Sequence, residues 1–352
     1  MKNLYILGTA GSGKTAIALG LALKFREQGY RVAYFKPVGH PAGVKGQEDE
    51  DGILMQQVLR LPYPIETIVP FTVGSSYLSG NRRAAALEQI TAAYRQVSGE
   101  ADIVIVGGAE FPYVMGCLGA DALTLARHFQ AAVLFAVQIK NDFGLDETIF
   151  FNTHFSQAGA NVLGNIFNNV PRPLLAKTEG VYRPVLAEKG YRTLGIIPSH
   201  PEIACPTVAE YYEVLGGEVL TGEDRLDRIV EDVVIGAMTT ESALGYLRRS
   251  PNKAVITGGD RADIALAALE TSTSVLILTG GLYPDVKVIA RAGEKSVPVI
   301  LVHYDTFTTI EKISEIERRI HPGDHRSIAM ARENIEKYCD WPGILEALVK
   351  LP

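Results

Sequence analysis

The sequence predicts an α/β protein in which a doubly wound parallel sheet precedes a second, smaller α/β domain. Three observations support this prediction. Residues 8–15 read Gly-Thr-Ala-Gly-Ser-Gly-Lys-Thr and match the GxxxxGK[ST] pattern, directly after the apolar run 4–7. Apolar runs and helical patterns then alternate, and several runs are continuously apolar, as in strands covered on both faces. Proline-rich residues 198–206 break this alternation, which restarts after them.

The bulk composition is that of a soluble globular protein. A length of 352 residues suggests about two domains, and 47% of the residues are apolar while 21% are charged. The net charge of -6 provides no basic field for nucleic acid or an anionic membrane. No apolar run reaches the ~20 residues of a membrane span, and no signal peptide is visible. We therefore expect a cytoplasmic protein whose three separated cysteines, Cys117, Cys205 and Cys339, stay reduced.

The first domain is expected to cover residues 1–205 and to fold as a P-loop nucleotide-binding domain. Continuous apolar runs predict its strands at 4–7, 31–36, 102–106, 132–137, 162–167 and 193–197. Helical patterns between them predict helices at 16–27, 52–60, 84–96, 120–128 and 147–157.

The second domain is expected to cover residues 206–322, with a helical tail at 323–352. Its pattern begins with a helix around 208–215 and continues with strands at 232–235, 254–256, 275–278 and 299–302. Helices are predicted at 241–249, 262–270, 286–292 and 308–319. The tail contains an amphipathic helix at 327–338, with Ile328, Ala331, Ile335 and Tyr338 on one face.

The glycine-rich loop between the first strand and the first helix is the clearest functional signal. Its glycines let backbone N–H groups surround a polyphosphate, and the following helix begins with a favourable field for anions. Lys14 would reach the outer phosphates and Thr15 would bind Mg²⁺. The alternative is a chance glycine-rich turn. The predicted nucleotide-binding residues of the loop are Gly8, Thr9, Ala10, Gly11, Ser12, Gly13, Lys14 and Thr15.

Four further side chains follow predicted strands, where open parallel sheets collect ligand-binding residues. Lys36 ends the second strand, and Asp51 lies in the acidic loop 48–51 before a helix. Lys36 is either a phosphate ligand or a surface lysine, and Asp51 either a Mg²⁺ ligand or part of a solvated loop that caps the helix. Glu110 is a candidate polarising acid or an ordinary loop residue, and Asn168 pairs with a purine edge or forms a turn.

These features together resemble dethiobiotin synthetase and the N-terminal domain of long phosphotransacetylases. The shared features are the GxxxxGKT loop, the Lys-Pro-Val strand end, the acid before the next helix, the strand ending in Gly-Gly and a GxIxN strand. The resemblance implies that Lys14, Thr15 and Lys36 face the phosphates of ATP. It also implies that Asp51 helps to hold Mg²⁺ and that Asn168 contacts the base. Lys14, Lys36 and Glu110 are the catalytic candidates.

The sequence departs from dethiobiotin synthetases at three places. Residues 10–12 lack the acidic and threonine side chains of the synthetase loop, and residues 107–108 are Gly-Gly where that family has Glu-Gly. Residues 39–40 are Gly-His where the synthetase has a small hydroxyl residue for its diamine substrate. We therefore expect ATP binding with Mg²⁺, but neither dethiobiotin synthesis nor efficient hydrolysis.

The second domain carries two Gly-Gly pairs after neighbouring strands. Right-handed crossovers would put both pairs on one rim of the sheet, where they either admit a ligand or form tight turns. Arg261 is the positive side chain there, expected to meet an anionic ligand or to pair with Asp260 or Asp263. The motifs resemble the DRTGG domain, and the predicted ligand site comprises Gly258, Gly259, Asp260, Arg261, Thr279, Gly280 and Gly281.

The whole chain thus resembles the regulatory front half of a phosphotransacetylase without its acetyl-transferring domain. The favoured hypothesis is a nucleotide-responsive regulatory protein in central carbon metabolism, with a small anionic ligand or a protein partner at the second domain. The alternatives are an ATP-dependent ligase or weak ATPase of the dethiobiotin synthetase or cobyrinic acid a,c-diamide synthase type, and a purely structural second domain. A homodimer or larger homo-oligomer is expected.

Overall fold

The computed structural model divides the chain into two compact units. It describes residues 2–40, 49–74, 77–79, 86–200, 205–314, 316 and 319–350. One unit is Met1–His200 with Ile320–Pro352, and the other is Pro201–Arg319. Residues 201–204 of the proline-rich stretch lie outside the described residues. Each unit contains one sheet, as the predicted fold class requires.

The sheet of the first unit is entirely parallel, with strand order β2-β3-β1-β4-β5-β6. From β1 the chain goes to β2 at one edge of the sheet and returns to β3 beside β1, and it then builds outward on the other side from β4 to β6, so the order reverses at β1. Ligands bind at such reversal points, beyond the carboxyl ends of the strands. The strands are β1 (Lys2–Gly8), β2 (Val32–Phe35), β3 (Ile103–Gly107), β4 (Ala132–Gln138), β5 (Asn161–Val170) and β6 (Thr193–Pro198).

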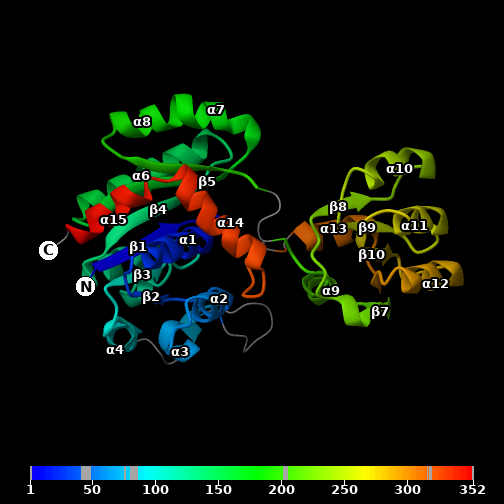
Figure 1. Cartoon of the computed structure of the whole chain (residues 1–352), viewed down its shortest axis with the longest axis horizontal. Helices are drawn as coiled ribbons and strands as arrows, with labels where there is room; N and C mark the ends of the chain where they lie inside the picture. Colours follow the sequence, from blue (N-terminus) through cyan, green and yellow to red (C-terminus); the bar gives the residue numbers. More distant parts are fainter. Residues whose placement is uncertain are drawn as a thin grey trace. The chain divides into compact units, whose positions relative to one another are not determined.

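Right-handed crossovers distribute the helices unequally over the two faces of this sheet. Side chains from α4, α5, α6 and α8 share one core cluster with Tyr5 and Leu7 of β1, whereas α1 packs on the opposite face. Figure 1 shows both layers. The helices before the second unit are α1 (Lys14–Glu27), α2 (Glu50–Val58), α3 (Ile65–Ile68), α4 (Ala86–Ser98), α5 (Ala122–His128), α6 (Asp142–Gln157), α7 (Leu175–Lys177) and α8 (Arg183–Glu188).

The C-terminal tail completes the α1 face of the first unit. Helix α14 (His325–Tyr338) contacts α1 and β6, and α15 (Trp341–Val349) contacts α1 and β1, as Figure 1 shows in red. Ala331 and Ile335 are buried, as the amphipathic pattern predicts. The buried side chain of Lys24 on α1 forms ion pairs with Glu27 and Glu336. Packing and charge thus both tie the tail to the first unit.

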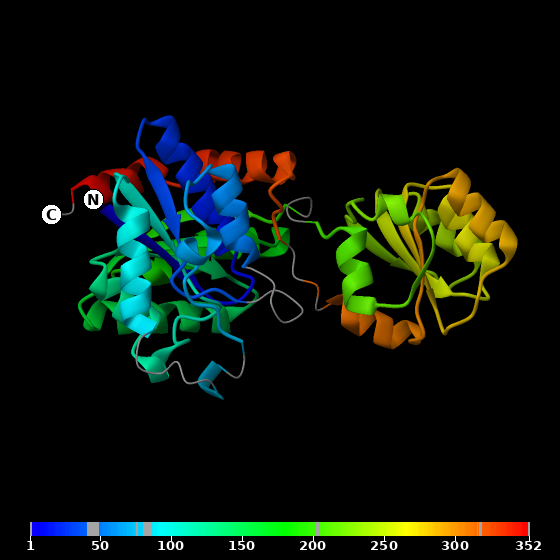
Figure 2. The ribbon, with the colours of Figure 1, turned by 90° about the horizontal axis from the view of Figure 1, so that it is seen from below.

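The second unit has a five-stranded sheet of order β7-β11-β10-β9-β8. Strands β8 to β11 are parallel, and β7, which the sequence did not predict, runs antiparallel to β11. Helices α10, α11 and α12 cover one face and α9 and α13 the other (Figure 2). The elements are α9 (Val208–Leu215), β7 (Glu218–Thr221), β8 (Asp232–Ile235), α10 (Thr240–Leu247), β9 (Lys253–Gly258), α11 (Ala262–Leu269), β10 (Thr273–Thr279), α12 (Val286–Glu294), β11 (Val299–Leu301) and α13 (Thr306–Ser314). Within the described residues, no helix has the length and apolarity needed to cross a bilayer.

The contact between α1 and α14 gives a testable prediction. A Cβ on Gly20 would lie 2.5 Å from the carbonyl oxygen of Ala331, so Gly20→Leu must push α14 away from α1. Overpacking of this kind costs about 2 kcal/mol of the free energy of unfolding. Denaturant unfolding, followed by the fluorescence of Trp341 in α15, measures the loss. Gly180→Leu, at an exposed helical glycine with open space around it, is the matched control, and equal losses for both variants would contradict the prediction.

Candidate functional site

The glycine-rich loop runs from the carboxyl end of β1 into the first turn of α1. Gly11 and Gly13 have φ values of 67° and 76°, which residues other than glycine rarely adopt. The backbone N–H of Ser12 donates to the carbonyl of Thr9, and this bond closes the loop. The ammonium of Lys14 donates to the carbonyl oxygens of Thr9 at 2.8 Å and Glu110 at 3.4 Å. Lys14 therefore lies over the loop, where it would meet a polyphosphate.

Residues of strands β4 and β5 lie against the glycine-rich loop and restrict its conformation. A Cβ on Gly8 would meet the Oγ of Ser12 at 2.5 Å and overlap the carbonyl oxygen of Ala136, so the loop can lie close to β4 only with glycine there. Asn168, near the end of β5, donates from Nδ2 to the carbonyl oxygen of Ser12 at 3.0 Å. A Cβ on Gly13 would overlap the same Nδ2. Asn168 therefore shapes the loop, while its contact with the base remains a prediction.

Lys36, which follows β2, lies in a buried charge cluster. Its ammonium is 2.8 Å from the nearer carboxylate oxygen of Asp49 and 2.6 Å from Asp51. The side chain of Asp49 is only 2% exposed, whereas that of Asp51 is 30% exposed. Asp49 also accepts hydrogen bonds from the backbone N–H groups of His40 and Gly52. The structure thus pairs Lys36 directly with Asp51, and it adds a buried aspartate, Asp49, that was not predicted as a site residue.

The cluster keeps Lys36 charged. Burial alone would lower the pKa of Lys36, but Asp51 and Asp49 outweigh burial and hold this pKa above its ordinary value. Asp49 is the N-cap of α2, a role that the sequence suggested for the acidic loop without identifying the residue. The sequence signal for this N-cap is an aspartate three residues before Gly52, because the carboxylate of an N-cap residue accepts a hydrogen bond from a backbone N–H in the first turn of the helix. Glu48 of the same loop lies outside the described residues.

The donor set suits Mg²⁺ bound together with phosphate. Mg²⁺ keeps several waters and takes one or two protein oxygens plus phosphate oxygens. Thr15 in the first turn of α1 and Asp51 in the first turn of α2 are oxygen donors of this kind. Among the described residues, no group of three or more His, Cys, Asp or Glu side chains could hold a metal by itself. A metal here would therefore depend on the nucleotide.

The end of β3 carries no acid. Gly107 is its last residue, and Gly108 donates from its backbone N–H to the carbonyl of Ile6 on β1. Glu110 follows with an exposed side chain, and its backbone carbonyl, not its carboxylate, accepts the hydrogen bond from Lys14. The phenol of Tyr34 on β2 fills the space beside Gly107. The sequence offered no signal for Tyr34, because its relation to Gly107 is purely spatial.

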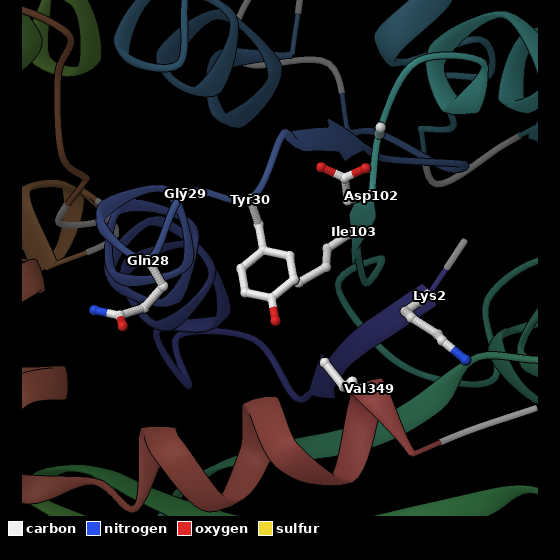
Figure 3. Close-up of a pocket in the computed structure, with 8 residues that line it drawn as sticks. Lys2, Gln28, Gly29, Tyr30, Asp102, Ile103 and Val349 are labelled. Atoms are coloured by element: carbon white, nitrogen blue, oxygen red, sulfur yellow. The ribbon is translucent and has the colours of Figure 1, made fainter.

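A cavity of about 470 Å³ lies at the other end of the same sheet. Lys2 at the start of β1, Asp102 and Ile103 at the start of β3, and Val349 of α15 line it. Figure 3 shows the ring of Tyr30 in this space, between Gln28 and Lys2. Because parallel strands begin at one edge and end at the other, this cavity is separate from the phosphate loop.

In the second unit, the two Gly-Gly pairs lie on one rim of the sheet. Strands β9 and β10 are parallel neighbours, with Gly258 paired to Thr279. A Cβ on Gly259 would lie 2.7 Å from the carbonyl carbon of Leu282 and overlap its oxygen, so the two strand ends touch. We call this surface the glycine rim; it comprises Gly258, Gly259, Gly280, Gly281 and Arg261.

Arg261 is paired with a carboxylate of its own helix. Its Nε and Nη2 donate to the two carboxylate oxygens of Asp263, each at 2.9 Å, and Nη2 also donates to the carbonyl of Met238. The hydrogen bonds from Arg261 and then from Thr240 hold the pKa of Asp263 well below its usual range. Of the two pairings that the sequence left open for Arg261, the structure has the one with Asp263.

The buried charge cluster predicts unequal roles for its two aspartates. Asp49→Ala leaves Lys36 with one partner and removes the cap of α2, so we expect a loss of about 3 kcal/mol in the free energy of unfolding. Asp51→Ala is the matched control: it deletes a partly exposed partner, and its loss should be smaller. Denaturant unfolding of both variants measures the difference, and equal or reversed losses would contradict this assignment.

Comparisons with known proteins agree with both units. A model of the AAA domain matches residues 2–207, and a model of the DRTGG domain matches residues 210–316. A phosphate acetyltransferase of Nitratidesulfovibrio vulgaris is 25% identical over 368 aligned positions, which cover 96% of this chain and 50% of that protein. The chain thus spans about half the length of this curated relative.

Two solved structures are similar to parts of the chain. Cobyrinic acid a,c-diamide synthase from Mycobacterium smegmatis, with bound ADP and magnesium, is 18% identical with a TM-score of 0.37, covering 57% of this chain and 87% of that chain. The CBS and DRTGG domains of the regulatory region of Clostridium perfringens pyrophosphatase, in complex with diadenosine tetraphosphate, are 19% identical with a TM-score of 0.29, covering 45% of this chain and 75% of that chain.

The family match extends from β1 through β6 and includes the phosphate loop, and the second match covers the glycine rim. The chain therefore belongs to the AAA domain family of P-loop proteins and carries a DRTGG domain behind its P-loop domain.

Proposed function

We propose that this chain is a nucleotide-responsive regulatory protein of the cytoplasm. ATP with Mg²⁺ binds at the phosphate loop of the first unit. Binding then changes how the glycine rim of the second unit engages a small anionic ligand or a protein partner. The observation that carries the proposal is the complete phosphate loop, shaped by Asn168 and overlain by Lys14.

The geometry of the loop supports nucleotide binding in three ways. The left-handed glycines Gly11 and Gly13 turn the backbone so that its N–H groups can surround an anion. The loop opens into α1, whose N-terminus favours negative charge. Lys14 donates to two backbone carbonyls, and a phosphate would offer it a stronger, charge-assisted acceptor.

The similarity to phosphate acetyltransferase supports a role connected with central carbon metabolism, and the matched part is half of that protein. A regulatory part needs to bind a nucleotide without consuming it rapidly, and the end of β3 offers no carboxylate beside the phosphate loop.

The geometry of the glycine rim supports the proposal that the second unit binds a ligand. Glycine pairs expose backbone at the carboxyl ends of β9 and β10, the edge where open sheets bind ligands. Arg261 uses Nε and Nη2 for Asp263 and Met238. Its Nη1 makes no hydrogen bond to any described residue, so an anion could bind to Arg261 without displacing Asp263.

We propose further that the protein acts as a homodimer or larger closed oligomer. Strand β8 lies at the edge of the second sheet, and its Val233 and Ile235 are 36% and 37% exposed. An edge strand with open backbone groups and exposed apolar side chains is suited to pairing with another chain. Symmetric association through such a surface is the commonest form of assembly.

Nucleotide binding depends on Lys14 in this proposal. Lys14→Ala should weaken ATP·Mg²⁺ binding by about 2 kcal/mol, or about 30-fold, because a charge-assisted contact is lost. Titration calorimetry measures the affinity, with Lys2→Ala, at the opposite end of the sheet, as the control. Equal affinity of Lys14→Ala and the wild type would refute the site. Rapid formation of ADP in the presence of a carboxylate or diamine acceptor would instead favour the alternative, an ATP-dependent ligase.

Communication between the units is tested by hydrogen exchange on the whole chain. ATP·Mg²⁺ should change exchange at residues 258–261 and 279–282 in the wild type, but not in Lys14→Ala. Arg261→Ala should bind ATP normally and lose the effect of the nucleotide on ligand or partner binding. Light scattering of the same samples reports the assembly, expected at twice the chain mass of 38.2 kDa or more. Unchanged exchange at the glycine rim with ATP bound would end the regulatory proposal.

A further inference from the structure

The last residue of β3 stands directly beside the phosphate loop. Gly107 pairs with Ile6 of β1, two residues before the loop begins at Gly8. Lys14 reaches across to the carbonyl of Glu110, just beyond Gly107. A side chain at position 107 would therefore stand at the edge of the sheet where the phosphates of a bound nucleotide would lie.

Tyr34 occupies the space of that missing side chain. It pairs with Ile105 on the neighbouring strand, and because Ala33 and Phe35 belong to the core of one face, Tyr34 points to the other. A Cβ on Gly107 would lie 2.7 Å from the Cζ of Tyr34 and overlap the hydroxyl oxygen. Tyr34 itself is 1% exposed and cannot turn aside into solvent.

The group beside Gly107 is a neutral phenol. Burial, and then the charges of Asp51 and Asp49, raise the pKa of Tyr34 well above its ordinary value. The carboxylates of Asp49 and Asp51 are bound to Lys36, and the side chain of Glu110 is exposed. Within the described part of the site, therefore, no carboxylate is held at the end of β3.

Hydrolysis of ATP is accelerated by a group that orients the attacking water, and more so if that group can also receive the proton of the water. The water oxygen bonds to the γ-phosphorus while the bond to the β-bridging oxygen breaks, which gives ADP and inorganic phosphate. A carboxylate is suited to accept the proton. A neutral phenol is already protonated and is not.

We propose that Tyr34 and Gly107 form a matched pair that makes this a site for retaining ATP rather than hydrolysing it. Tyr34 fills the position from which a side chain on β3 could act on the attacking water, and Gly107 is required by the presence of Tyr34. The inference rests on the proposed ATP binding and adds a reason for the slow turnover that the sequence leads us to expect. In this proposal Tyr34 is the residue that leaves no room for an acidic side chain at position 107.

The steric part is tested by a double-mutant cycle on thermal unfolding. Gly107→Ala should lower the melting temperature in the wild type and have little effect in Tyr34→Val, which keeps a strand-forming residue but lacks the ring. Gly108→Ala is the matched control. Its Cβ would lie 2.7 Å from the carbonyl oxygen of Ile6, so removing the ring of Tyr34 should not rescue it. Additive effects of Tyr34→Val and Gly107→Ala would overturn the matched pair.

The catalytic part is tested by phosphate release from ATP. The wild type should hydrolyse ATP slowly, and Tyr34→Val with Gly107→Glu should release phosphate at least tenfold faster at similar ATP affinity. Stimulation of Tyr34→Val by added formate, a small carboxylate for the vacated space, is a second measurement that does not need the glutamate variant to fold. The proposal is overturned if the wild type already turns over at roughly 1–10 s⁻¹, or if formate and the double variant leave turnover unchanged.

These outcomes separate the inference from the proposed function. If calorimetry finds no ATP binding by the wild type, the proposed function fails, while the unfolding cycle still decides whether Tyr34 and Gly107 are coupled. If ATP binds and neither variant gains turnover, ATP binding stands and the role assigned to Tyr34 is wrong.

Discussion

The close approach of the phosphate loop to the ends of β4 and β5 is the constraint on which the site depends. Gly8 lies against the carbonyl of Ala136, and Gly13 against the amide of Asn168, which also bonds to the carbonyl of Ser12. At neither glycine is there room for a side chain. The loop therefore keeps the curvature that exposes its N–H groups only while three strands, β1, β4 and β5, are in place. Order at the nucleotide site is thus a property of the assembled sheet.

A second consequence of the sheet is the charge distribution at its carboxyl edge. The strand order places β3 beside β1 and β2 beyond β3, which brings Lys36 to the same edge of the sheet as the loop and Tyr34 against Gly107. Lys36 is neutralised by Asp49 and Asp51, so its positive charge is largely compensated before any ligand arrives.

The C-terminal tail packs on the same face of the sheet as α1, and the chain topology explains why this face is open to it. Right-handed crossovers place α4, α5 and α6 on one face, which leaves α1 to cover the other. The return of the chain after the second unit supplies α14 and α15 to that face. The second unit is thus an insertion between parts of the first, and both of its ends start from the P-loop unit.

The sequence alone determined the phosphate loop, the α/β class and the positions of most strands and helices, because these depend on local patterns. Glycine spacing, continuous apolar runs and helical periodicity all act over fewer than twenty residues. Helix α6 was predicted to start at 147 but starts at Asp142, since its first turn has no apolar periodicity. The edge strand β7 was missed because it is short and carries a weak local pattern, and α15 was expected only as part of a helical tail, without bounds of its own.

Which side chains meet depends on tertiary packing and could not be predicted from local patterns. Lys36 and Asp49 are separated by 13 residues, and Ser12 and Asn168 by 156, so neither contact leaves a local pattern. The same holds for Tyr34 against Gly107, where a tyrosine inside one strand explains a glycine at the end of another. The sequence could identify the kind of ligand, since a phosphate loop acts through its own backbone. The side chains that surround the loop are distant from it in sequence, and only packing brings them together.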